Sequence, residues 1–195
     1  IGGKTGVTII GYKVFTGNSE DTLTGATDQL QGATQAIIVG YGSIGSYAFY
    51  GATSLTSVTI PASVTSIGNS AFSGASSLTN ITVNPSNKNY KSTDGVLFNK
   101  DGTILIQYPV GNTGPSYTIP ASVTTIGESA FHQATGLTTV TFEAGSQLTS
   151  IGSNAFQNAS KLTSIIIPAS VKTIGAAAFH QATGLTTVTF EAGSQ

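Results

Sequence analysis

The segment Gly40-Tyr-Gly-Ser-Ile-Gly45 has the Gly-x-Gly-x-x-Gly spacing of a dinucleotide-binding turn, and the apolar run Ala36–Val39 before it resembles a strand. In such turns the glycines let the backbone approach a pyrophosphate at the start of a helix. No long helical pattern follows, however, and no acidic residue for the ribose lies between Asp28 and Asp94. Ile44-Gly45 also recurs along the chain. We therefore interpret the segment as part of a repeat and expect no cofactor.

Other reactive side chains also lie at repeated positions. His132 and His180 are equivalent residues of two repeats, as are Glu143 and Glu191. Two repeats separate the histidines by about 10 Å if each repeat adds one strand spacing. We therefore expect solvated loop histidines rather than a metal site, and no tuned acid–base pair. Serine is abundant, but no Gly-x-Ser-x-Gly elbow is present. The sequence predicts no catalytic residues and no enzyme.

Two aspartates offer a weaker possibility. Asp94 and Asp101 lie near Asn87, Asn89 and Asn99, and Ca²⁺ takes oxygen ligands. Neither an EF-hand nor a nonapeptide calcium pattern is present, and each aspartate precedes a glycine. Asp-Gly is a common turn dipeptide. We prefer the turn interpretation and predict no metal.

The composition excludes several classes of partner. Only 8% of the 195 residues are charged, the basic residues are all Lys, and the net charge is −1. A nucleic-acid-binding protein needs a basic surface to neutralise phosphates, so none is expected here. No apolar run approaches the roughly 20 residues that span a bilayer, so we expect no membrane insertion in this segment. The chain has no Cys, which excludes disulfides and thiolate metal sites.

The dominant signal is an internal repeat. The pattern Ile-Gly-x-x-Ala-Phe begins at Ile44, Ile67, Ile126, Ile151 and Ile174, in steps of 23, 59, 25 and 23 residues. A Leu follows each Phe by six residues, at Leu55, Leu78, Leu137, Leu162 and Leu185. Residues 130–147 and 178–195 are identical over 18 positions, which indicates recent duplication or homogenisation of the array.

Each repeat is too short to hold a core by itself, so successive repeats must stack. From Leu55 the pattern alternates, which predicts a strand with Val58 and Ile60 inward; Pro61 would end it. The sequence therefore predicts a β-rich solenoid of ~23-residue repeats. We expect a parallel sheet connected by short irregular or 3-10 turns.

Two regions depart from the repeat. Residues 1–40, with possible strands at Val7–Ile10 and Ala36–Val39, are expected to form an N-terminal cap or a divergent repeat. The long step contains an insertion at about 84–116, in which apolar runs flank Asn99–Gly102. This pattern predicts a β-hairpin that projects from the solenoid or lies at its edge. The chain stops within a repeat at Gln195, which suggests either a fragment or an end that stacks on a partner.

Residues 55–75, Leu-Thr-Ser-Val-Thr-Ile-Pro-Ala-Ser-Val-Thr-Ser-Ile-Gly-Asn-Ser-Ala-Phe-Ser-Gly-Ala, resemble the BspA-like, treponemal-type leucine-rich repeat. The resemblance covers residues 41–195 and includes Asp94-Gly-Val-Leu-Phe and Tyr108-Pro in the insertion. Where the family often has Cys, this chain has Ala, as at Ala75. The resemblance implies an extracellular or cell-surface protein that binds host or neighbouring-cell surfaces.

The outward strand positions form the candidate ligand-contact surface. These residues are Ser57, Thr59, Asn80, Thr82, Thr139, Thr141, Ser164, Ile166, Thr187 and Thr189. They are either a merely soluble sheet face or an adhesive surface for a protein or glycan. The alternatives are a structural subunit whose solenoid ends associate into an extracellular fibre and, less favoured, ice binding through the threonine rows.

Overall fold

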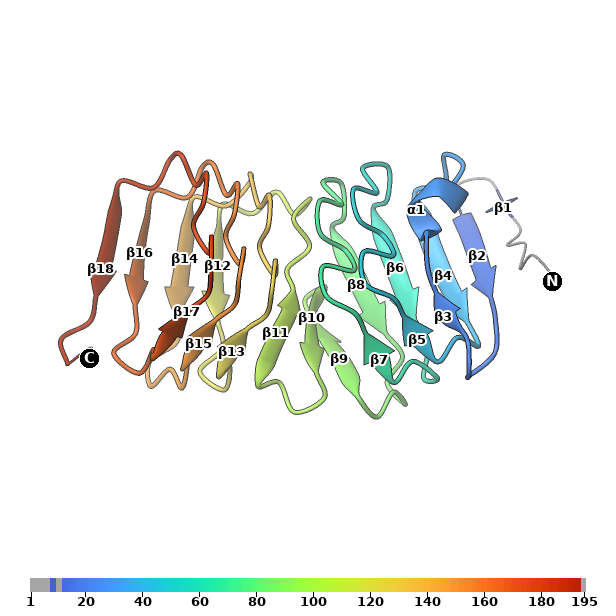
Figure 1. Cartoon of the computed structure of the whole chain (residues 1–195), viewed down its shortest axis with the longest axis horizontal. Coiled ribbons are helices and arrows are strands. Elements are labelled where there is room, and N and C mark those ends of the chain that lie inside the picture. The colour runs from blue at the N-terminus through green and yellow to red at the C-terminus, as the bar shows by residue number, and fades with distance from the viewer. Residues whose placement is uncertain (1–7, 10–11, 194–195) are drawn as a thin grey trace.

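The computed structural model describes residues 8–9 and 12–193 as a β-solenoid of about eight turns (Figure 1). Most neighbouring strands are parallel, and successive turns are spaced by about 23 residues, so the predicted fold is confirmed. Among the described residues, α-helix is limited to α1 (Ala26–Gln29). In the described part of the chain, no helix is long and apolar enough to cross a bilayer.

The longer strands of the solenoid form two sheets. The first has the order β1-β2-β4-β6-β8 and the second has the order β12-β14-β16-β18. Their bounds are β1 (Thr8–Ile9), β2 (Tyr12–Thr16), β4 (Gln35–Val39), β6 (Ser57–Ile60), β8 (Asn80–Val83), β12 (Ser116–Ile119), β14 (Thr139–Phe142), β16 (Ser164–Ile167) and β18 (Thr187–Phe190).

The other strands lie on the opposite side of each turn, in the orders β3-β5-β7 and β17-β15-β13-β11-β10-β9; β9, β10 and β11 have four residues each and the rest have two. Their bounds are β3 (Thr22–Leu23), β5 (Ser43–Ile44), β7 (Ser66–Ile67), β9 (Tyr90–Thr93), β10 (Val96–Asn99), β11 (Ile104–Gln107), β13 (Thr125–Ile126), β15 (Ser150–Ile151) and β17 (Thr173–Ile174).

The N-terminal region continues the stacking. β2 pairs in parallel with β4, and β4 with β6. On the other side of the turn, β3 pairs in parallel with β5. On these pairings we interpret residues 12–39 as a divergent repeat. Of the strand expected at Val7–Ile10, only Thr8 and Ile9 fall within the described residues, as β1.

Tight turns connect the two sides of each repeat. Hydrogen bonds of the 3-10 type occur in them, such as those from the Ala75 N–H to the Phe72 carbonyl and from the Leu78 N–H to the Ala75 carbonyl. The residue before each Ala-Phe has a positive φ: Tyr47, Ser70, Ser129, Asn154 and Ala177. Within each half, N–H groups of these turns bond to carbonyls of the next repeat, which extends the stacking beyond the sheets.

The core contains a row of aromatic rings stacked along the solenoid axis. Phe131 lies between Tyr108 and Phe156, with ring centroids 5.1 and 4.8 Å away. Phe156 then stacks on Phe179 at 5.2 Å. Phe49 and Phe72 form the equivalent pair in the other half, at 5.3 Å. Such stacks contribute packing energy beyond the burial of each ring.

The insertion lies in line with the solenoid, between its two halves (Figure 1), instead of projecting from it or lying at an edge. β9, β10 and β11 are antiparallel neighbours, and β11 then pairs in parallel with β13. β10 is buried on both faces: Val96 and Phe98 join the C-terminal core, while Leu97 joins the N-terminal core. This two-sided burial explains the position, because the insertion fills the space that a regular repeat would occupy.

The two halves also meet directly on the turn side, at a junction that we call the seam. There the Asn69 side chain donates to Glu128 at 2.8 Å, and Ser70 donates to Ser129 at 3.1 Å. Hydrogen bonds between side chains therefore join residues that are 59 positions apart in the sequence.

A serine–histidine contact completes the seam. Ser73 Oγ lies 2.6 Å from His132 Nδ1, and both residues are buried. The expectation of a solvated loop histidine is therefore wrong for His132, which the seam covers. His180, its equivalent, is exposed.

We predict that Phe131→Ala lowers the free energy of unfolding by about 3–5 kcal/mol, because the fully buried ring loses both stacking partners and leaves a cavity. Denaturant unfolding measures the change. Ile166→Ala is the matched control, since that side chain is 57% exposed and its loss should change stability little. Equal effects of the two variants would contradict the proposed packing.

We also predict that acid weakens the fold through His132. Burial lowers the pKa of His132 below its ordinary value of 6.5. Between 6.5 and that lowered pKa, the unfolded chain binds a proton that the folded protein does not, so stability falls as the pH falls through this window. Unfolding free energies measured from pH 7.5 to 5.5 test this. The slope should flatten in His132→Asn and persist in His180→Asn; a wild-type slope in His132→Asn would refute it.

Candidate functional site

The candidate contact residues project outward from the longer strands. Nine of the ten are exposed and Ser57 is half-buried, while the strand residues between them, such as Val58 and Ile165, are buried. Parallel register aligns them across strands. Ser57 pairs with Asn80 in one sheet, and Ser164 with Thr187 in the other. The structure therefore places all ten on outer sheet faces; their role in ligand contact stays a prediction.

These residues form two separate fields rather than one continuous row. β8 ends the first sheet and β12 begins the second, and the insertion lies between the two halves. The first field comprises Ser57, Thr59, Asn80 and Thr82; the second comprises Thr139, Thr141, Ser164, Ile166, Thr187 and Thr189. Sequence reasoning missed this division because it did not place the insertion inside the solenoid.

The second field contains a split between β14 and β16. These strands pair only at Thr139 and Ser164, whereas β16 pairs with β18 along its whole length. The segment from Phe142 to Ile151 is two residues longer than the equivalent segment from Ile119 to Ile126. We attribute the split to this longer loop, which lets the ends of the strands diverge.

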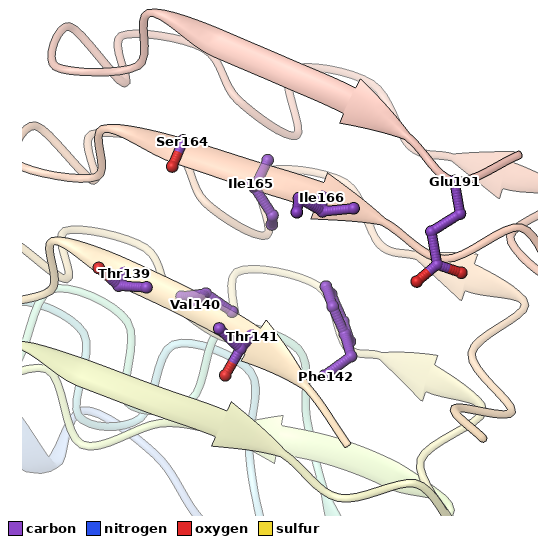
Figure 2. A pocket seen from close by; sticks show the side chains of 8 residues that line it. All are labelled: Thr139, Val140, Thr141, Phe142, Ser164, Ile165, Ile166 and Glu191. Atoms are coloured by element: carbon purple, nitrogen blue, oxygen red, sulfur yellow. The ribbon is translucent and has the colours of Figure 1, made fainter. Parts of the chain in front are cut away.

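A cleft of about 300 Å³ occupies the split (Figure 2). Its lining residues are Thr139, Val140, Thr141, Phe142, Ser164, Ile165, Ile166 and Glu191. Four of them belong to the predicted contact surface. Figure 2 shows side chains of β14 and β16 on the two sides of the cleft and Glu191 beyond the end of β16. We call this site the sheet cleft.

The sheet cleft offers binding groups of mixed character. Ile166 and the half-buried Phe142 supply apolar surface, and the threonines and Ser164 supply hydroxyls that both donate and accept hydrogen bonds. Glu191 accepts a hydrogen bond from the Ala169 N–H at 3.1 Å. Apolar anchors among adaptable polar groups suit recognition of a surface by shape and hydrogen bonding.

The repeat-equivalent residues Glu143 and Glu191 connect neighbouring repeats through hydrogen bonds. Glu143 accepts a hydrogen bond from the Ala121 N–H at 2.8 Å, the same contact that Glu191 makes with Ala169. Each carboxylate therefore ties the loop after one strand to the Pro-Ala turn of the preceding repeat. This shared role fits the interpretation that they are repeat features rather than an acid–base pair.

The Gly-x-Gly-x-x-Gly segment is also part of the stacking. Ser43 and Ile44 form β5, which pairs in parallel with Ser66 and Ile67 of β7. A Cβ at Gly42 would overlap the carbonyl of Ser19 in the preceding turn. The glycine is thus required by close contact between turns, and the interpretation as a repeat feature is confirmed.

The other residues considered for metal chemistry are dispersed or engaged. In the part of the chain that the structure describes, no group of three or more His, Cys, Asp or Glu residues could hold a metal ion. Asp94 lies in the turn between β9 and β10. The Asn87 amide donates to the carbonyls of Pro61 and Val64 and so anchors the start of the insertion. His132 meets Ser73, but its other ring nitrogen lies 3.5 Å from the Asn158 amide rather than near a carboxylate.

A second hollow lies where the insertion meets β12, and sequence reasoning did not find it. Its volume is about 380 Å³, and it is lined in part by Lys91, Asp94, Phe98, Tyr117, Pro120 and Glu143. We call it the insertion pocket. Tyr117 pairs with Val140 of β14 and so takes a position that holds Val or Ile in the other complete repeats. This departure from the repeat was the signal available in the sequence.

Comparisons place the chain among bacterial leucine-rich repeat proteins. A family model described as a BspA type leucine-rich repeat region matches six copies, over residues 40–101 and 113–195. A search of curated proteins found no match. A solved leucine-rich repeat protein from Eubacterium ventriosum is 25% identical with a TM-score of 0.57; the match covers 95% of this chain and 69% of that one.

Two further solved structures are similar. The pneumococcal vaccine antigen PcpA is 25% identical with a TM-score of 0.64, and the match covers 81% of this chain and 46% of PcpA. A leucine-rich cell surface protein from Faecalibacterium prausnitzii is 27% identical with a TM-score of 0.50, and the match covers 88% of this chain and 60% of that one. The family match extends over most of the sequence, and this chain belongs to the BspA-type leucine-rich repeat family.

Proposed function

We propose that this protein is a secreted or cell-surface binding module of adhesive type, which recognises a protein or glycan through its outer sheet face. The observation that carries the proposal is the sheet cleft, where exposed Ile166 stands among strand hydroxyls. The description of a similar Faecalibacterium protein as a cell surface protein supports the location. Ser73 and His132 could pair as a nucleophile and its base, but both are buried in the seam and so do not support a catalytic alternative.

The physical properties of the face suit such a role. Extended solenoid surfaces bind partners over a large area, and repeated positions offer the same contact several times. Large apolar groups that are exposed at the centre of a polar field are typical anchors of protein interfaces. Ile166 is 57% exposed, and its neighbours across the sheet include Thr189 on β18. A partner that covered the cleft would bury this side chain.

We predict that Ile166→Glu weakens binding about tenfold or more, because it replaces an apolar anchor with a charge that a partner would have to desolvate. Binding is measured by surface plasmon resonance on immobilised extracellular-matrix proteins and oligosaccharides. Since Ile166 is exposed, the melting temperature should stay close to that of the wild type.

Thr59→Glu is the matched control, as it places the same charge on the first field, away from the cleft. Equal binding by Ile166→Glu and the wild type would overturn the role of the cleft, and so would equal losses in both variants. A wild-type protein that bound neither class of probe would count against the proposed function itself.

A second candidate function is a structural subunit that associates end to end into an extracellular fibre. The last described turn exposes Ile174, Val188 and Phe190 by 41%, 42% and 53%. Ile151, the equivalent of Ile174, and Val140, the equivalent of Val188, are buried in earlier repeats. Another turn of solenoid, from the same chain or from a second copy, would cover these side chains.

For this alternative we predict concentration-dependent assembly that Phe190→Lys abolishes. Analytical ultracentrifugation and negative-stain electron microscopy would detect it. Ile166→Lys, which adds the same charge to the sheet face, should leave assembly intact. Strictly monomeric behaviour across the concentration range would exclude the fibre.

A further inference from the structure

The insertion pocket combines three features that the repeat alone does not supply: charges of both signs, an aromatic hydroxyl and an apolar lining. Lys91 comes from β9 and Asp94 from the turn after it, whereas Tyr117 comes from β12 and Glu143 follows β14. Pro120 and the half-buried ring of Tyr117 contribute apolar surface, whereas Phe98 is only 3% exposed. Its volume of about 380 Å³ falls within the range of roughly 300–1,000 Å³ typical of small-molecule sites.

Local structure accounts for the positions of Asp94 and Lys91. Asp94 and Gly95 have φ angles of 51° and 78° and form a two-residue turn between Thr93 and Val96. Such positive values at both positions are typical of the type I′ turn, a tight hairpin connection. Lys91 Nζ lies over Gly102, where a Cβ would approach it to 2.5 Å. The backbone thus leaves space for the ammonium group.

The ring of Tyr117 packs against two aromatic residues of the core. Its ring lies 5.1 Å from that of Tyr108 and 6.0 Å from that of Phe131, so it rests on the stacked aromatic row. Burial raises the pKa of Tyr117, and the carboxylates of Asp94 and Glu143 add to the effect. The phenol therefore stays protonated and can both donate and accept a hydrogen bond.

The side chains of Lys91, Asp94 and Tyr117 make no hydrogen bond or ion pair with any residue of 8–9 and 12–193. Glu143 uses one carboxylate oxygen on the Ala121 N–H. The pocket thus presents an unshared donor, unshared acceptors and a hydroxyl beside Pro120.

The chemistry of these groups restricts the ligand. An anion would face Asp94 and Glu143, and a cation would face Lys91, so the mixed charges disfavour strongly charged ligands of either sign. A sugar ring carries adjacent hydroxyls that donate to carboxylates and accept from an ammonium group. Its apolar C–H face can lie against aromatic and proline surfaces. A neutral polyhydroxylated ring fits this combination better than a ligand whose charges are all of one sign.

We propose that the insertion pocket binds a neutral saccharide unit of a glycan. Asp94 and Glu143 accept from its hydroxyls, Lys91 donates to them, and Tyr117 does both. The inference rests on the proposed binding function, but it names the ligand class and a site separate from the sheet cleft.

The test uses a glycan array that carries neutral and sialylated oligosaccharides, followed by titration of the best neutral oligosaccharide into the protein. Tyr117→Phe keeps the ring packing and removes only the hydroxyl, and Asp94→Asn keeps the size of the side chain in its turn. Each variant should lose at least about tenfold in affinity while it keeps the wild-type melting temperature. The matched control is Asp28→Asn, which makes the same change at an exposed residue of α1 outside both sites and should bind the oligosaccharide like the wild type.

Three outcomes would overturn the proposal: no neutral glycan bound, a preference for sialylated glycans, or unchanged affinity in both Tyr117→Phe and Asp94→Asn. The two proposals fail separately. Loss of matrix-protein binding in Ile166→Glu with a blank glycan array would leave the sheet cleft supported and the pocket refuted. Saccharide binding that depends on Tyr117, with Ile166→Glu unaltered on every probe, would refute the cleft and support the pocket.

Discussion

Stacking of equivalent residues from one turn to the next is the constraint on which this structure depends. A turn of about 23 residues is too short to cover its own inward side chains, so it must bury them against the neighbouring turns. Parallel strand pairing supplies the main-chain bonds, and the ring of Phe131 between Tyr108 and Phe156 shows how the core continues across turns. Each repeat packs on equivalent residues of its neighbours. The apolar character of side chains such as Val58 and Ile60 therefore follows from their position in the repeat.

At the insertion, that continuity is replaced by other contacts. β10 serves both cores, with Leu97 on one side and Val96 and Phe98 on the other. At the seam, the Ser73–His132 contact joins turns that are far apart in sequence. Side-chain contacts there connect neighbouring turns, as backbone hydrogen bonds do within each half. This arrangement divides the outer sheet and opens a pocket at the junction.

The sequence was sufficient to predict the solenoid, its period and its inward residues, because these follow from local alternation and repetition. It could not predict environments set by which turns become neighbours. His132 and His180 lie in identical 18-residue segments, yet one is buried in the seam and the other is exposed. Phe142 and Phe190 likewise differ in exposure. The ten outward residues could be placed on the sheet face, but the split between β14 and β16 depends on loop length acting through three-dimensional pairing.

The same argument indicates where specificity can arise in such a protein. Residues that serve stacking are constrained to be alike in every repeat, so a ligand would meet the same surface at each turn. Departures from the repeat are free of that constraint. Tyr117 replaces a Val or Ile, and the longer loop after Phe142 separates two strands. Both departures coincide with hollows on the surface, one beside Lys91 and Asp94 and one beside Ile166. Regular repeats therefore provide a rigid frame, and its irregularities provide the hollows that we propose as contact sites.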